Sequence, residues 1–309
     1  MLKAAAAQVA ARQAGSRVFG ELQSLDGILA VNKPSGISCS GLLDYFKRNI
    51  GRGHLAAPFR DHFEHERELR KSGKKIRRRM DKSDSGKSYL AMGRLGVATD
   101  SYDAEGRVTK IAPTEGITAH GMEELLAEFT GEIMQRPPIY SAIRVDGMRL
   151  YQYARAGNKV NVKNIRLLHF VNPQAGAEFG TPVALPEKFL EYFVTDRYAW
   201  VDGCPEMQEG MLMTPYVNQP DTASFQILIQ SGGGGVYVRS LVHDIGERLG
   251  SAATMTSLLR TSQGPLRLDR DTIEVEDLVY VDRVRDAIAH AENVIRAVGA
   301  ERSLDVYFE

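Results

Sequence analysis

Residues 87–106 read KSYLAMGRLGVATDSYDAEG, and much of the expected fold follows from this stretch. Its first part, Tyr89–Val97, is rich in apolar and β-prone residues and predicts a strand. Asp100–Gly106 is polar and ends in glycine, which is typical of a turn, and Arg107–Ile111 predicts a second strand. The stretch therefore predicts two strands joined by a polar turn.

Strands and helices follow one another irregularly on both sides of this stretch. A short strand at Gly27–Val31 precedes a Pro-Ser-Gly turn and a helix whose apolar positions are Leu42, Leu43, Phe46 and Ile50. Further along the chain, the patterns predict strands at 160–171 and 225–229 and helices at 120–129, 148–156, 239–249 and 282–298. The apolar stripe of the first of these helices is Met122, Leu125, Leu126 and Phe129, and Gly250 is expected to end the helix at 239–249. Because this order lacks the regular alternation of a doubly wound sheet, the sequence favours an α+β fold.

The composition divides the chain into three parts. Residues 1–26 form an N-terminal tail whose first twenty residues are alanine-rich and free of acids, which fits either an organelle-targeting helix or an ordinary tail. Residues 27–280 form the expected domain, with insertions at about 52–84 and 172–222 that are charged or proline-rich and lack sustained periodicity. Residues 281–309 form a C-terminal helix and tail.

The overall composition excludes several classes of protein. Hydrophobic residues make up 43% and charged residues 25% of the 309 positions, as in ordinary soluble domains. No apolar run approaches the roughly 20 residues that a membrane-spanning helix needs. Cys39 and Cys204 are too few for a disulfide framework or a zinc site, and the seven histidines show no ligand spacing, so we expect no metal.

Positive charge is concentrated in one segment, although 39 basic and 39 acidic residues cancel over the whole chain. Ten Lys or Arg residues and three acids lie between Arg67 and Lys87, with Arg77, Arg78 and Arg79 at the centre. These three arginines are candidate RNA phosphate contacts, because such a run can neutralise several phosphates. A solvated helix face or a nuclear-import signal explains the run equally well.

Four separated segments carry a family resemblance. The first is Lys33-Pro34-Ser35-Gly36, and the second runs from Lys87-Ser88-Tyr89 to Gly106. The third is Pro137-Pro138-x-Tyr140-Ser141-Ala142 with Gly147-x-x-Leu150-Tyr151 and Ala154-Arg155-x-Gly157. The fourth is Gly235-Val236-Tyr237-Val238-Arg239-Ser240-Leu241 with Asp244-x-Gly246 and Leu259-Arg260. In this order the segments resemble the TruB-type tRNA pseudouridine-55 synthases, and the basic insertion is more similar to the eukaryotic, fungal-like form than to the compact bacterial one.

The resemblance implies the pseudouridine synthase catalytic-domain fold, which is a mixed, mainly antiparallel sheet with flanking helices. It implies isomerisation of the T-loop uridine 55 of tRNA: the N1-glycosidic bond breaks, the base turns while it is held, and C5 is joined to the sugar. No cofactor is implied. The expected partner is tRNA, bound by a monomer through its T-arm and elbow, and the target base is flipped into a pocket.

The resemblance also assigns roles to residues. Tyr89 is the ring that stacks on the flipped base, and Arg239 pairs with the catalytic aspartate and orients it through its guanidinium fork. The implied substrate-binding positions are Lys33, Pro34, Tyr89, Tyr237 and Leu259. By position alone, Tyr89 is also compatible with an ordinary strand aromatic and Arg239 with an exposed arginine at a helix start.

The family's catalytic aspartate is not identifiable in this sequence. Its motif, Gly-Gly-Thr-Leu-Asp-Pro, is expected before Lys87 and occurs nowhere in the chain. Asp81 and Asp84 lie in that interval without the flanking residues of the motif, so neither is assigned a catalytic role. We therefore expect the chain as written to bind tRNA without making pseudouridine.

Several functions stay open on the sequence alone. They are an active tRNA isomerase, an inactive tRNA-binding or tRNA-folding protein, and an incomplete gene model of the active enzyme. Residues 231–235 offer a weaker phosphate-loop interpretation, because no Gly-Lys-Ser/Thr ending follows the glycines. The expected location is the nucleus or the mitochondrion, with the cytoplasm as an open alternative.

Overall fold

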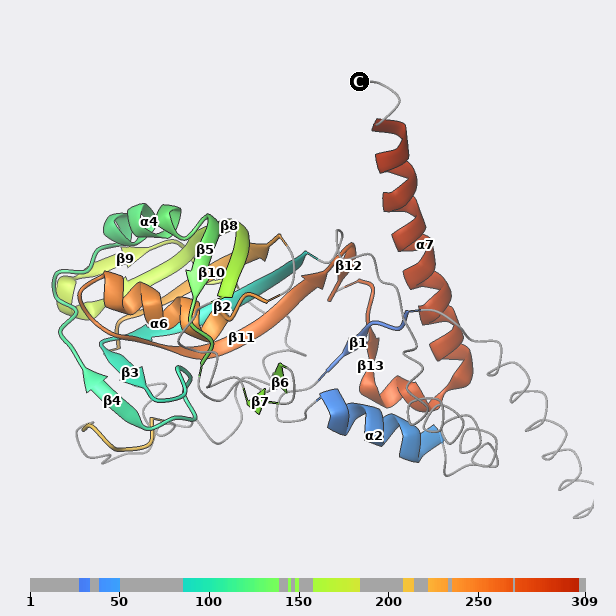
Figure 1. Cartoon of the computed structure of the whole chain (residues 1–309), viewed down its shortest axis with the longest axis horizontal. Coiled ribbons are helices and arrows are strands. Elements are labelled where there is room, and N and C mark those ends of the chain that lie inside the picture. The colour runs from blue at the N-terminus through green and yellow to red at the C-terminus, as the bar shows by residue number, and fades with distance from the viewer. Residues whose placement is uncertain are drawn as a thin grey trace, which may run out of the picture. The chain divides into compact units, whose positions relative to one another are not determined.

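The computed structural model describes residues 28–33, 39–50, 86–138, 144–145, 148–149, 158–183, 208–213, 222–232, 235–268 and 270–305. The chain forms two compact units (Figure 1). The central unit comprises residues 81–264, and the terminal unit comprises residues 1–80 together with 265–309. The predicted domain limits and insertions stay predictions.

An antiparallel sheet forms the body of the central unit (Figure 1). Its strand order is β11-β2-β10-β8-β5, and β9 pairs with β8. The strands are β2 (Lys87–Leu95), β5 (Gly131–Gln135), β8 (Asn158–Asn172), β9 (Ala177–Phe179), β10 (Ser224–Ser231) and β11 (Ala253–Gln263). The 3-10 turn Pro173–Ala175 connects β8 to β9. This sheet confirms the predicted α+β class with mainly antiparallel pairing.

Two helices complete the core of the central unit. Helix α4 (Ala119–Glu128) begins at Thr118, whose side chain accepts a hydrogen bond from the Gly121 backbone amide at 3.1 Å, and buries the predicted apolar stripe. Helix α6 (Val238–Arg248) ends before Gly250, which has a left-handed φ of 73°. Both helices share one apolar cluster with the sheet, which includes Met122, Leu126, Phe225, Ile227, Leu241 and Ile245. Each of these fully buried side chains contributes about 2 kcal/mol relative to an exposed one.

A small hairpin follows β2. The expected single strand 89–97 is divided at Gly96, which has a φ of 81°, so that β3 (Val97–Thr99) starts a new sheet with β4 (Val108–Ile111). The predicted turn 100–106 joins these two strands. Residues 208–213 lie beside β4, with the Val108 amide donating to the Met211 carbonyl at 2.7 Å.

The terminal unit joins the two ends of the chain. Strand β1 (Val31–Asn32) pairs in parallel with β13 (Ile273–Glu274), and a small apolar cluster packs around Ile273 and Val284. The remaining elements are α2 (Cys39–Ile50), β12 (Leu266–Arg267), the 3-10 helix η6 (Val275–Val279) and α7 (Val281–Asp305). No helix in the described part of the chain is long and apolar enough to span a membrane.

One predicted helix is wrong where it can be compared. Met148–Arg149, expected to begin a helix, form strand β7, which pairs with β6 (Arg144–Val145). The backbone groups of these residues are used in a hairpin ladder, so they do not form a helical turn. The rest of that predicted helix lies outside the described residues.

Candidate active site

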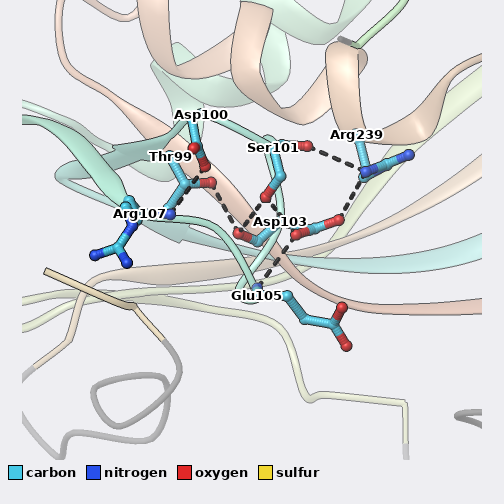
Figure 2. Close-up of polar contacts among 7 residues, drawn as sticks. All are labelled: Thr99, Asp100, Ser101, Asp103, Glu105, Arg107 and Arg239. Carbon is cyan, nitrogen blue, oxygen red and sulfur yellow. Dashed lines mark hydrogen bonds and ion pairs between the residues drawn. The ribbon is translucent and has the colours of Figure 1, made fainter. Parts of the chain in front are cut away.

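The turn between β3 and β4 is held by its own polar groups (Figure 2). Asp103 Oδ1 accepts hydrogen bonds from Ser101 Oγ at 2.6 Å and from the Glu105 backbone amide at 3.2 Å. The Asp103 carbonyl accepts from Thr99 Oγ1 at 2.8 Å. The last position of the turn requires glycine, because a Cβ on Gly106 would lie 2.2 Å from Ser101 Oγ. The Asp103 carboxylate therefore has a fixed direction.

Arg239 reaches this carboxylate from the first turn of α6 (Figure 2). Its Nη1 donates to Asp103 Oδ2 at 2.8 Å and to the Ser101 carbonyl at 3.2 Å. The two charged side chains are 26% and 22% exposed, so the pair is only partly screened by water. Within the described part of the chain, the other guanidinium nitrogens of Arg239 have no hydrogen-bond acceptor. Arg239 is thus oriented by one carboxylate and retains donors for another group.

The start of α6 is clamped by the end of β5. Gln135 is 1% exposed, and its side chain accepts from the Tyr237 backbone amide at 3.0 Å and donates to the Tyr237 carbonyl at 3.3 Å. Ser240 Oγ donates to the Arg136 carbonyl at 2.7 Å. Burial raises the pKa of the Tyr237 hydroxyl. These hydrogen bonds fix the turn of α6 that carries Arg239.

A second contact joins the β3–β4 turn to α6, one helical turn beyond Arg239. Tyr102 stacks on His243 with ring centroids 3.9 Å apart and planes at 14°. The Tyr102 backbone has a φ of 63°, and its carbonyl accepts from the Met255 amide at 3.1 Å. Burial lowers the pKa of His243, so the ring is mainly neutral near pH 7.

Tyr89 lies on β2, on the side of the sheet that faces the helices. Its ring is 7% exposed and belongs to the main apolar cluster. Arg260 pairs with Tyr89 in the β2–β11 register, and its Cζ atom lies 5.4 Å from the centre of the Tyr89 ring. Leu258 is opposite Ala91 on the same face, whereas Leu259 is opposite Leu90 and points to the other face by strand alternation.

Two family models match this chain. The TruB family pseudouridylate synthase N-terminal domain matches residues 72–175, and the tRNA pseudouridylate synthase B C-terminal domain matches residues 239–298. Human pseudouridylate synthase TRUB1 is 30% identical over 307 residues, which cover 93% of this chain and 74% of the human protein. The chain belongs to the TruB family of pseudouridylate synthases.

The match covers a smaller share of two other similar proteins. The tRNA pseudouridine synthase B of Lactobacillus delbrueckii subsp. bulgaricus is 32% identical over 69% of this chain and 57% of the bacterial protein. A solved H/ACA RNP bound to a substrate RNA containing 2′-deoxyuridine is 17% identical, with a TM-score of 0.37, over 82% of this chain and 52% of that chain.

The central unit of this TruB-family chain brings together only part of the predicted site. Arg239 and Tyr237 lie at the start of α6, and Tyr89 shares an apolar cluster with their neighbour Val238. Leu259 is not on the face of Tyr89, and Leu258, with 38% exposure, occupies that face instead. The role of Leu259 as a wall of the base pocket stays a prediction, and strand alternation places its side chain on the face opposite to Tyr89.

The remaining predicted residues lie in the terminal unit or outside the described residues. Lys33 is an exposed residue directly after β1 in the terminal unit. Pro34, the three arginines 77–79, Asp81 and Asp84 lie outside the described residues. In the described part of the chain, no three His, Cys, Asp or Glu side chains gather as metal ligands.

Sequence reasoning assigned no role to Asp103, Gln135 or Tyr102. Asp103 belongs to the Thr-Asp-Ser-Tyr-Asp-x-x-Gly segment of the predicted turn. Its place among the polar residues between Thr99 and Gly106 was the one signal in the sequence that could have indicated a role for it. Gln135 directly precedes Arg136 and the Pro137-Pro138 pair, but a lone glutamine after a strand gives no indication that it is buried. Their partners are more than a hundred residues away in the sequence.

Proposed function

We propose that this protein is a tRNA pseudouridine synthase that binds the T-arm of tRNA and isomerises uridine 55 of the T-loop. The observation that carries the proposal is the orientation of Arg239 by Asp103 and Ser101, with guanidinium donors that no described residue uses. A guanidinium held on one side by a carboxylate can position a second anionic group on its other side. The names of the TruB-family relatives supply the reaction and the substrate class.

The proposed reaction needs a base that is held outside its folded loop, and it needs no redox partner. The bond between N1 and C1′ of the uridine breaks and a bond between C5 and C1′ forms, while a proton leaves C5 and one is taken up at N1. A flipped base can be held by stacking on an aromatic ring, and Tyr89 is the ring that the family resemblance assigns to this task. The chain's own contribution is then to hold the base and to orient the reacting carboxylate.

A second candidate function is tRNA binding without isomerisation. The observation that favours it is the absence of the Gly-Gly-Thr-Leu-Asp-Pro motif from the sequence. An oriented arginine supports catalysis only if a carboxylate is present beside it, and Asp103 is already engaged in holding the arginine.

One experiment separates the two candidates. The purified chain is incubated with an unmodified tRNA transcript, binding is measured, and pseudouridine is mapped in the T-loop. The matched control is a chain with the Gly-Gly-Thr-Leu-Asp-Pro segment restored. Pseudouridine at position 55 with the chain as it stands supports the proposal, and Asp81→Asn and Asp84→Asn then show which carboxylate is used.

The other outcomes are equally informative. Product only from the restored chain supports the second candidate, and a chain that neither binds tRNA nor modifies it overturns both.

The proposal includes a monomer. Size-exclusion chromatography with light scattering should then give about the chain mass of 34.2 kDa for the free protein, and this mass plus that of one tRNA for the complex. It also includes a location in the nucleus or mitochondrion, which fractionation of cells expressing the tagged chain would test.

A further inference from the structure

Two cationic side chains lie beside Tyr89 on the same face of the sheet. Lys87 is two residues before Tyr89 on β2, so both side chains point to one face, and Arg260 is the direct register partner of Tyr89 on β11. Gln263, the register partner of Lys87, accepts a hydrogen bond from Arg260 Nη1 at 3.0 Å. Lys87 and Arg260 therefore approach each other around Gln263, at the ends of two neighbouring strands.

The electrostatics of this pair are unfavourable in the protein itself. Burial, and then the positive charge of Arg260, lower the pKa of the Lys87 ammonium group. In the part of the chain that the structure describes, neither cation forms an ion pair with a carboxylate. Lys159, by contrast, lies 2.7 Å from Glu132, which raises the pKa of Lys159. Two like charges without a counter-charge are relieved by a bound anion.

The chemistry of the surroundings selects the class of anion. A planar guanidinium and an ammonium group are the side chains that bind phosphate oxygens. The Tyr89 ring beside them is suited to a nucleobase, and a nucleotide carries a base and a phosphate at a fixed short spacing. The Arg260 guanidinium lies over the Tyr89 ring, which is 7% exposed, so a base that stacks on the ring displaces this guanidinium.

We propose that Lys87 and Arg260 together bind one phosphate group of the RNA backbone, next to the nucleotide whose base stacks on Tyr89. The inference rests on the proposed function in taking RNA as the ligand and Tyr89 as the ring on which its base stacks, and it does not require isomerisation. The displaced guanidinium keeps a favourable partner, because the phosphate replaces the ring as its neighbour. The site is therefore specific for a phosphate that accompanies an extruded base.

Binding of an unmodified tRNA transcript to the full chain, measured over a range of salt concentrations, tests this site. Lys87→Gln and Arg260→Gln should each weaken binding about tenfold, as expected for a charge-assisted contact. The slope of log K against log salt should fall by about one counterion in the double variant. Because both cations share one phosphate, the double variant should lose little more than either single variant.

The matched control is Lys163→Gln. Lys163 is an exposed lysine at the register shift between β8 and β10, and its Cε atom and the Asn161 side chain both approach the position of a Cβ on Gly232. Because Asn161 alternates with the buried core residue Val162, Lys163 lies on the opposite face of the same sheet, and it has no ion pair within the described residues. Its affinity for tRNA should stay within about twofold of the parent chain, since a screened charge on another face contributes little. An equal loss in Lys163→Gln would reduce the effect to bulk charge and overturn the site.

Further outcomes also decide the question. An unchanged slope in the double variant, or losses that multiply as for separate phosphates, would contradict a shared phosphate site. Arg260→Lys keeps the charge and should keep the salt slope, and thermal unfolding of each variant identifies any loss that comes from misfolding.

If the slopes change as expected while no pseudouridine forms, isomerisation fails and the phosphate site stands. If pseudouridine forms while the slopes stay unchanged, isomerisation stands and the phosphate site fails. A parent chain that binds no tRNA overturns the site together with its ligand.

Discussion

Asp103 in the central unit and Asp271 in the terminal unit are both surrounded by hydrogen-bond donors that include an arginine, but they differ in exposure and in what their partners do. The Asp271 side chain is fully buried and accepts from the Arg267 amide at 2.8 Å, from Arg270 Nε at 3.1 Å and from His290 Nε2 at 2.8 Å. The Asp103 side chain is 22% exposed, and Arg239 keeps donors that Asp103 does not use. A fully buried aspartate fixes a fold, whereas a partly exposed one can position a group for a ligand.

The sequence distance between partners differs in the same way. Arg267 and Arg270 belong to the same turn as Asp271, and His290 lies on the adjacent α7. Asp103 and Arg239 are 136 residues apart and come from a hairpin turn and a helix start. We therefore expect changes at Asp271 to alter stability and changes at Asp103 to alter function.

The largest effect that tests this comparison is on catalysis. Asp103→Asn should lower the single-turnover rate of pseudouridine formation on the order of 100-fold, because Arg239 loses the carboxylate that orients it. The free energy of unfolding should change by less than about 1 kcal/mol, since the ion pair is partly exposed. The rate is measured with whichever form makes pseudouridine, either the chain as it stands or the chain with the restored motif.

Affinity for tRNA is the control for this variant. The affinity should remain within a few-fold of that of the parent chain, because Asp103 is a carboxylate and does not bind RNA phosphates. An unchanged rate in Asp103→Asn, or a loss of rate that is explained by a loss of folding, would contradict a functional role for Asp103.

The second effect is on stability and its pH dependence. Burial alone would raise the pKa of Asp271, but hydrogen bonds from Arg270, His290 and the Arg267 amide lower it to about 2. A lowered folded-state pKa means that the ionised group stabilises the protein above its ordinary pKa near 4 and loses this effect as pH falls towards 2. The contribution at pH 7 is about 2 kcal/mol.

Denaturant unfolding from pH 7 down to pH 3 measures this contribution. Asp271→Asn should be about 2 kcal/mol or more less stable than the parent at pH 7, and the difference should narrow as the pH falls below 4. His290→Ala should show part of the same loss and no change in tRNA affinity. A pH-independent difference would mean that packing, and not the charge of Asp271, accounts for the loss.

The sequence predicted those parts of the fold that depend on local patterns. The apolar stripe of α4 and the glycine after α6 are short-range signals, and both were confirmed by burial and backbone geometry. Strand β11 was not predicted, because its burial does not alternate along Ala253–Gln263 and two bulges interrupt its pairing with β2. The residues around Met148 carry apolar side chains at helical spacing, but hairpin pairing outweighed that preference.

The only site residues that could be predicted are those that belong to the family's sequence motifs. The resemblance predicts that Arg239 pairs with the catalytic aspartate, which stays a prediction, and the structure shows Arg239 paired with Asp103. Nothing in the sequence links these two residues, because long-range hydrogen bonds leave no periodic pattern. The face on which Leu259 lies could not be predicted, since two adjacent leucines of a strand differ in the face they occupy and not in their chemistry.

The smallest predicted effect concerns backbone strain in the turn that carries Asp103. Tyr102 is the one non-glycine residue with positive φ in the described part of the chain, a conformation that costs roughly 1 kcal/mol or more. Its stacking on His243 and the hydrogen bond from the Met255 amide offset this cost.

Tyr102→Gly should therefore be about 1 kcal/mol more stable than Tyr102→Ala, because glycine adopts the left-handed region freely. Tyr102→Phe should match the parent, since it keeps the ring, and Tyr102→Ala should be about 1 kcal/mol less stable than Tyr102→Phe. Chemical denaturation of the three variants measures both differences, and equal stabilities of the Ala and Gly variants would show that the left-handed backbone at position 102 stores no strain.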